Sequence, residues 1–124
     1  MLSRVLIPLL ASRLVIATEA AADEYLQAML AWRNCIYAQA DDLVTESDAA
    51  PGAIAVLALD HCTPEQDAFH LSMKMRRLSD ETITRTLEAS WIWYREFVSA
   101  RVDHIRMYGE PPPNQPPLSS SDQR

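Results

Sequence analysis

The chain is poor in the residues that build flexible loops, basic surfaces and membrane spans. It has 2 glycines and 2 cysteines among 124 residues, and 11 lysine and arginine side chains against 17 acidic ones. Affinity for nucleic acid depends largely on basic side chains that neutralise phosphates, so a formal charge of -6 argues against a nucleic-acid binder. There is no apolar run of about 18 residues, which argues against a membrane-spanning helix.

Sequence motifs for catalysis are missing as well. The chain has no Gly-x-Ser-x-Gly, no glycine-rich phosphate loop and no His-Glu-x-x-His. Asp60 and His61 are neighbours, but adjacent side chains on a helix point in different directions and do not form an oriented acid-base pair. We therefore expect a protein that is not an enzyme and that has no cofactor.

What the sequence does contain is a helical pattern of apolar residues. Between residues 23 and 109 these residues recur at intervals of three and four, which predicts an all-α domain resembling a small four-helix bundle. We expect helices at 23–44, 51–61, 63–78 and 80–108, so that two short central helices precede one long C-terminal helix. The residues expected to face the core are Tyr25, Met29, Trp32, Ile36, Ala40 and Leu43, then Ile54, Leu57 and Ala58, then Ala68, Leu71, Met75 and Leu78, and finally Ile83, Leu87, Trp91, Tyr94, Val98, Val102 and Ile105. Phe69 and Met73 are expected to widen the apolar face of the third helix.

Local signals set the expected ends of these helices. Pro51 is acceptable only at a helix start, which puts a turn before it. Thr63 is followed by proline and, three residues later, by Gln66, a pattern typical of a helix cap. Ser79 is expected to cap the long helix, and Gly109 to end it.

Residues 1–22 have the features of a secretory signal peptide. Arg4 gives the positive start, an apolar stretch follows, and small residues precede the expected cleavage after Ala22 or, as a second choice, after Ala20. Arg13 departs from this pattern because it interrupts the apolar stretch. The signal predicts that the mature protein is periplasmic or secreted.

The alternative is an amphipathic first helix that stays in the mature protein. Its apolar face would be formed by Leu2, Leu6, Leu9 and Leu10. At the other end, residues 110–124 are rich in proline and serine, and we expect a disordered tail there.

Cys35 and Cys62 are consistent with export. In an oxidising compartment, an even pair in a short chain is more often a disulfide than two free thiols. A loop of this size would contribute roughly 3.5 kcal/mol of stability by the chain-entropy estimate. Two unpaired buried cysteines and metal ligation remain the alternatives, although the histidines do not form a recognised zinc spacing with them.

The long helix carries a second apolar face formed by Trp93, Phe97, Ala100 and His104. One interpretation is that this helix is central and covered on both sides. The other is an exposed aromatic patch that binds an unknown protein partner or a second copy of the chain, since aromatic residues are favoured interface anchors. We therefore expect an exported, non-enzymatic interaction module that binds through the long helix.

A soft-metal or copper-binding protein is the alternative function. His70 and Met73 share a helical face, with His61 and Cys62 upstream, and imidazole and sulfur ligands favour cuprous copper. Against this, methionine commonly fills gaps in a core. We assign no metal site from the sequence.

Overall fold

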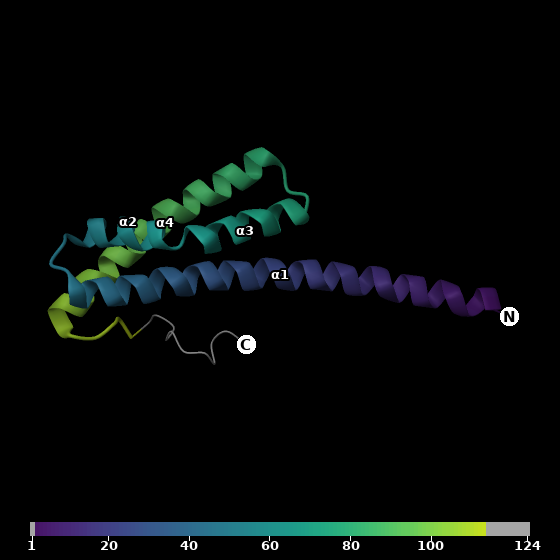
Figure 1. Cartoon of the computed structure of the whole chain (residues 1–124), viewed down its shortest axis with the longest axis horizontal. Coiled ribbons are helices and arrows are strands. Elements are labelled where there is room, and N and C mark those ends of the chain that lie inside the picture. Colours follow the sequence, from purple (N-terminus) through teal and green to yellow (C-terminus); the bar gives the residue numbers. More distant parts are fainter. Residues whose placement is uncertain (1, 114–124) are drawn as a thin grey trace.

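The protein is all-helical, as the spacing of its apolar residues predicts. The computed structural model describes the backbone of residues 2–113 and the side chains of residues 23–113. Within that range there are four helices and no strand (Figure 1): α1 (Leu2–Glu46), α2 (Pro51–His61), α3 (Thr63–Met75) and α4 (Asp80–Tyr108). None of these helices combines the length and apolarity needed to cross a bilayer.

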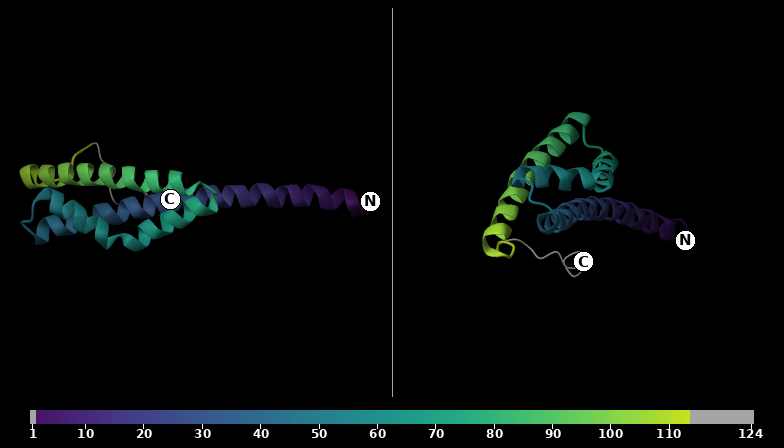
Figure 2. Two further views of the ribbon diagram at one scale, coloured as in Figure 1. Left: turned by 90° about the horizontal axis from the view of Figure 1, so that it is seen from above. Right: turned by 60° about the vertical axis from the view of Figure 1, so that its left-hand side comes forward.

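The helices form a small bundle around the second half of α1. α2 and α3 lie one after the other along α1 and run in the opposite direction to it, and α4 crosses them at an angle (Figures 1 and 2). α2 packs most closely on α4, and α3 packs most closely on α1. The N-terminal part of α1 extends beyond the other three helices (Figure 1).

The expectations for the two chain ends are not tested by this structure. α1 is continuous through the expected cleavage region, but the side chains of residues 1–22 lie outside the described ones. The expected tail, residues 110–124, lies mostly outside the described residues, which end at 113. Both the signal peptide and the disordered tail therefore stay predictions.

The caps of the long helix are confirmed. The Ser79 hydroxyl accepts a hydrogen bond from the backbone N–H of Thr82 at 3.2 Å. Gly109 ends the helix with φ of 79°, a left-handed conformation that glycine adopts at little cost. Pro51 stands in the first turn of α2, where its missing N–H costs no helical hydrogen bond.

The expected threonine cap of α3 is wrong. Thr63 is the first residue of the helix, and its hydroxyl donates to the carbonyl oxygen of Asp60 at 2.9 Å. Cys62 takes the cap position, because its carbonyl oxygen accepts the first backbone bond, from Gln66, at 3.0 Å. The helix also ends at Met75, three residues before the expected end.

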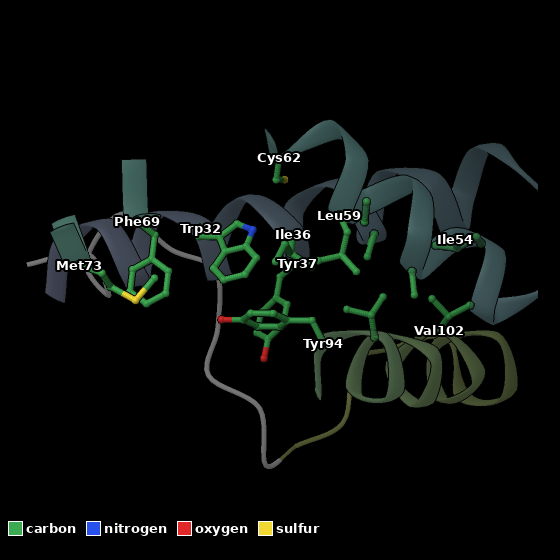
Figure 3. Close-up of a cluster of buried hydrophobic side chains, with 14 of the residues drawn as sticks. Trp32, Ile36, Tyr37, Ile54, Leu59, Cys62, Phe69, Met73, Tyr94 and Val102 are labelled. Carbon is green, nitrogen blue, oxygen red and sulfur yellow. The ribbon is translucent and has the colours of Figure 1, made fainter. Parts of the chain in front are cut away.

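The core is built mainly from α1, α2 and α4. Trp32, Ile36 and Ala40 are buried as the spacing in α1 predicts, and Tyr37 is buried beside them. Figure 3 shows aromatic and aliphatic side chains from all four helices meeting at this centre. The other fully buried or nearly fully buried apolar residues are Ile54, Ala55, Ala58, Leu59, Cys62, Phe69, Met73, Ile83, Tyr94, Val98 and Val102.

The face of α3 that turns inward differs from the expected one. Leu71 and Met75 are 59% and 54% exposed, and Ala68 is exposed too, whereas Phe69 and Met73 are buried. This orientation agrees with the disulfide, which holds residue 62 toward α1, because positions seven and eleven residues later lie on the same helical face, and Phe69 packs on Tyr25 and Trp32 of α1.

A similar error affects the short helix α2. Leu57 is exposed, and Leu59 is buried in its place. In α2 nearly every residue is apolar, so spacing alone does not distinguish its two faces.

Two long-range links tie the helices together. The predicted disulfide between Cys35 and Cys62 is confirmed, with the two Cα atoms 5.9 Å apart, and it joins α1 to the start of α3. Arg101 of α4 donates from Nε and from its terminal nitrogen to the two carboxylate oxygens of Asp41 in α1, at 2.9 and 2.8 Å. The Arg101 side chain is 4% exposed, so this ion pair belongs to the core.

Candidate functional site

A continuous series of aromatic contacts crosses the bundle from α3 to α4. The ring centres of Tyr25 and Phe69 lie 5.4 Å apart, and those of Phe69 and Trp32 lie 5.6 Å apart. Trp32 then meets the edge of Tyr94 at 5.2 Å, and Tyr94 meets Trp93 at 5.1 Å. Distances of this size are typical of attractive ring pairs, so each ring is held by its neighbours.

The series continues from Trp93 back into the core. Trp93 stacks on Phe97 with ring centres 4.6 Å apart, and Phe97 stacks on Tyr37 at 5.6 Å. A guanidinium group lies over each terminal ring, that of Arg76 at 4.5 Å from the centre of Tyr25 and that of Arg101 at 5.2 Å from Tyr37. Surface and core are therefore one connected aromatic unit.

An open cavity of about 170 Å³ lies over the first part of this series. A cavity of about 150 Å³ can hold a benzene ring, so this one has room for a single apolar side chain. We call it the aromatic groove. It lies between α1, α3 and the first half of α4, and its lining residues are Tyr25, Met29, Trp32, Phe69, Thr86, Ser90, Trp93 and Tyr94.

Two hydroxyl groups give the aromatic groove a polar edge. The hydroxyls of Thr86 and Ser90 donate to the carbonyl oxygens one helical turn earlier, at 2.8 and 2.7 Å, and their oxygens can still accept. Nearby, the indole N–H of Trp91 donates to the side-chain oxygen of Gln66 at 2.9 Å and so fixes α4 relative to α3. A mostly apolar lining with a few polar groups is typical of binding sites.

The four residues predicted as a partner-binding face are not equivalent in the structure. Trp93 is 50% exposed and forms one wall of the aromatic groove. Phe97 is half-buried against Tyr37, and Ala100 is exposed. His104 stands further along the helix, where its Nδ1 lies 2.9 Å from the carbonyl oxygen of Glu110. Phe97 is therefore partly covered and Trp93 is exposed, and binding of a partner to this face stays a prediction.

Burial affects the ionisation of two tyrosines in this aromatic unit. Desolvation raises the pKa of Tyr37 to about 12, helped by nearby Tyr94 and opposed by Arg33 and Arg101. Desolvation also raises the pKa of Tyr94, against the effect of Arg33. Both phenols stay neutral at physiological pH, and neither is suited to accept a proton in a reaction there.

A second cavity, of about 420 Å³, lies beside the disulfide. Cys35 and Glu65 line it together with the side-chain amides of Gln27 and Asn34. The sulfurs of Cys35 and Cys62 and a carboxylate oxygen of Glu65 lie within 4.8 Å of one another. Oε2 of Glu65 is buried, and no hydrogen-bond partner for it occurs among the described residues.

The residues considered for copper binding differ in their burial, and copper binding by them stays untested. Met73 is fully buried in the core, and His70 is half-buried. His61 is exposed at the end of α2. Among residues 23–113, the group of three ligand side chains that comes together is instead Cys35, Cys62 and Glu65.

Sequence reasoning missed most of the aromatic groove and the carboxylate beside the disulfide. It placed Tyr25, Trp32 and Tyr94 in the core but gave no sign that they line a cavity. The position of Glu65, three residues after a cysteine and so on the same helical face, is a signal that could have pointed to the second cavity.

Comparison with known proteins gives no match for this chain among family models, curated sequences or solved structures.

Proposed function

We propose that this chain is an exported, non-enzymatic interaction module that binds a protein partner, or a second copy of itself, through α4. The observation that carries the proposal is the aromatic groove with Trp93 at its wall. Trp93 is half-exposed, yet its ring is held between Tyr94 and Phe97. Binding to a ring that is already fixed loses little conformational freedom, and exposed tryptophans are frequent hot spots.

The groove suits one apolar side chain of the partner. Its volume and lining match a leucine or phenylalanine anchor, and the Thr86 and Ser90 oxygens can accept a hydrogen bond from the partner backbone. Arg76 lies exposed over Tyr25 at the edge of the groove. An acidic residue next to the anchor would therefore find a cation within reach.

Export is proposed from two features that support each other. Residues 1–22 have the pattern of a signal peptide, and the Cys35–Cys62 disulfide is the kind of bond that persists in oxidising compartments. Expression of the full chain in a bacterium followed by N-terminal sequencing tests this part. A mature chain that begins near residue 23 is the expected result, and an intact Met1 contradicts export through this signal.

The binding proposal is tested with a matched pair of variants. Trp93→Ser removes the wall of the groove, whereas Ile92→Ser changes the neighbouring residue, which is exposed to a similar degree but lines a different cavity beside Gly52. Phe97 is left unchanged because its ring supports Tyr37. We expect Trp93→Ser to lose the partners recovered from envelope extract by immobilised wild type, and Ile92→Ser to keep them. Equal recovery by all three proteins contradicts the proposal.

Binding to a second copy is measured separately. Sedimentation velocity over a dilution series would show a monomer–dimer equilibrium that Trp93→Ser weakens and Ile92→Ser does not. A chain that stays monomeric at all concentrations excludes the self-binding form and leaves a different protein as the partner.

A further inference from the structure

We propose that reduction of the disulfide turns Cys35, Cys62 and Glu65 into the ligands of a zinc-binding site. This site is separate from the aromatic groove and is independent of the function proposed above. The three side chains come from α1 and from the start of α3, and their ligand atoms already lie within 4.8 Å of one another. Thiolate and carboxylate are both ligands that Zn²⁺ accepts.

The geometry fits zinc once the sulfur–sulfur bond is broken. With Zn–S of about 2.3 Å and Zn–O of about 2.1 Å, a tetrahedral site needs roughly 3.8 Å between the sulfurs and roughly 3.6 Å between sulfur and oxygen. The Cα atoms of the two cysteines are 5.9 Å apart, so rotation of the side chains can supply this separation without moving the helices.

Glu65 gives the second, independent indication of a ligand. Its Oε2 atom is buried and has no hydrogen-bond partner among the described residues. A buried carboxylate oxygen without a partner is costly, and a cation between it and two thiolates would remove that cost. Zinc binds thiolates, so its binding to the reduced chain releases the two thiol protons.

The cavity beside the disulfide provides access for both the reductant and the ion. Cys35 lines this cavity, whereas Cys62 is fully buried, so an incoming thiolate can reach the Cys35 sulfur. Cys62 then leaves as a thiolate between the end of α2 and the start of α3 and takes a proton from solvent. Gln27 and Asn34 also line the cavity and can hydrogen-bond a water in the fourth zinc position.

The overall reaction is balanced with a dithiol as the reductant. Its first thiolate forms a mixed disulfide with Cys35 and releases Cys62, and its second thiol displaces Cys35. The dithiol is oxidised to its disulfide, and the two cysteines gain two electrons and two protons. Zn²⁺ then replaces the two thiol protons. Reoxidation of the cysteines by a disulfide, which takes up two electrons and two protons and becomes two thiols, expels the metal. The same pair is then a disulfide in oxidising surroundings and a metal site in reducing ones.

The test measures zinc bound to the full chain in its two redox states. Reduced and oxidised protein are mixed with ZnCl₂ under anaerobic conditions, desalted and analysed for metal by mass spectrometry. We expect one zinc per reduced chain and none per oxidised chain. Reduced wild type that retains no more zinc than the Cys35→Ser/Cys62→Ser variant overturns the proposal.

The carboxylate ligand is tested with a matched variant. Glu65→Gln should weaken zinc binding at least tenfold in a chelator competition, and Asp67→Asn, an exposed acidic neighbour in the same helix, should leave it unchanged. Co²⁺ bound to reduced wild type should give thiolate charge-transfer bands and the visible bands of a tetrahedral site. Equal affinity of Glu65→Gln and wild type would refute the three-ligand site.

Far-UV circular dichroism separates binding to the folded site from binding to loose thiols. We expect the reduced chain to stay helical and its thermal midpoint to rise when zinc is added. A reduced chain that is unfolded both with and without zinc overturns the proposal, because the three ligands would then not be held together.

Discussion

The two halves of α4 carry the same apolar pattern but have different surroundings. In residues 80–93 only Ile83 is buried, whereas Tyr94, Val98 and Val102 are buried in residues 94–108, together with Arg101. The second half crosses α2 and the end of α1, while the first half diverges from α1 and leaves the aromatic groove between them (Figures 1 and 2). An apolar face thus becomes core where a neighbour covers it and stays exposed, as the proposed binding surface, where none does.

This difference separates the residues that stabilise the protein from those proposed to bind. The disulfide and the Arg101–Asp41 pair both lie outside the aromatic groove, and both join distant parts of the chain. Substitutions at these links should lower stability, and substitutions on the exposed side of the groove should affect binding alone.

The largest expected effect is loss of the disulfide. The Cys35→Ser/Cys62→Ser variant should lose roughly 3.5 kcal/mol of unfolding free energy, because the unfolded chain is no longer closed into a loop. Urea denaturation followed by circular dichroism measures the change. A shift of less than about 1 kcal/mol would mean that the bond does not constrain the unfolded chain as this estimate assumes.

Loss of the buried ion pair comes next. Asp41→Ala removes both hydrogen bonds that the Arg101 guanidinium donates to this partly exposed carboxylate and should lower the free energy of unfolding by about 2 kcal/mol. Glu81→Ala is the matched control, since the Glu81–Arg85 pair on the first half of α4 is largely exposed, and it should cost no more than about 0.5 kcal/mol. Equal losses of unfolding free energy in Asp41→Ala and Glu81→Ala would contradict the difference in burial between the two halves of α4.

Alkaline pH should destabilise the contact between α1 and the second half of α4 through Tyr37. This residue of α1 packs against Phe97 and Arg101 of α4. This phenol has a pKa of about 12 in the folded protein and about 10 when unfolded, so the folded state holds its proton more tightly. Its contribution to stability is complete below pH 10 and is lost as the pH rises from 10 to 12. Tyr37→Phe should show a smaller fall in thermal midpoint over this range. Identical pH profiles for the variant and wild type would show that Tyr37 does not cause the fall.

The smallest expected effect is at the uncovered end of α4. Ser79→Ala removes the hydroxyl that accepts a hydrogen bond from the backbone N–H of Thr82. It should lower the free energy of unfolding by about 1 kcal/mol, mostly through fraying of the first turn of α4. Hydrogen exchange should become faster in the first turn of α4 and remain unchanged near Val98. Uniformly faster exchange along α4 would indicate that the two halves open as one unit.

Much of the fold could be predicted from the sequence because its signals are local. The bounds of α2 and α4, the Ser79 cap and the Gly109 stop follow from residue type and position. The Cys35–Cys62 pair could be predicted because only one intramolecular pairing exists. These features depend on neighbours along the chain or on a unique partner.

The remaining features depend on contacts between distant residues. Leu71 and Met75 form as regular a stripe as Phe69 and Met73, and the pair that turns inward is the one that contacts α1, on the side of the disulfide. The helical spacing predicts a second apolar face at Trp93, but the groove beside it exists because Tyr25 and Phe69 approach from other helices. The Arg101–Asp41 pair, 60 residues apart, left no signal in the local pattern.

Site-specific photo-crosslinking tests the central claim most directly. A benzophenone amino acid placed at Thr86, on the edge of the aromatic groove, or at Asp103, an exposed position in the second half of α4, would be activated in cells that make the protein. We predict a crosslinked adduct of defined mass from position 86, lost when Trp93→Ser is added, and none from position 103. No adduct at position 86, or the same adduct from both positions, would contradict the assignment of the groove as the binding surface.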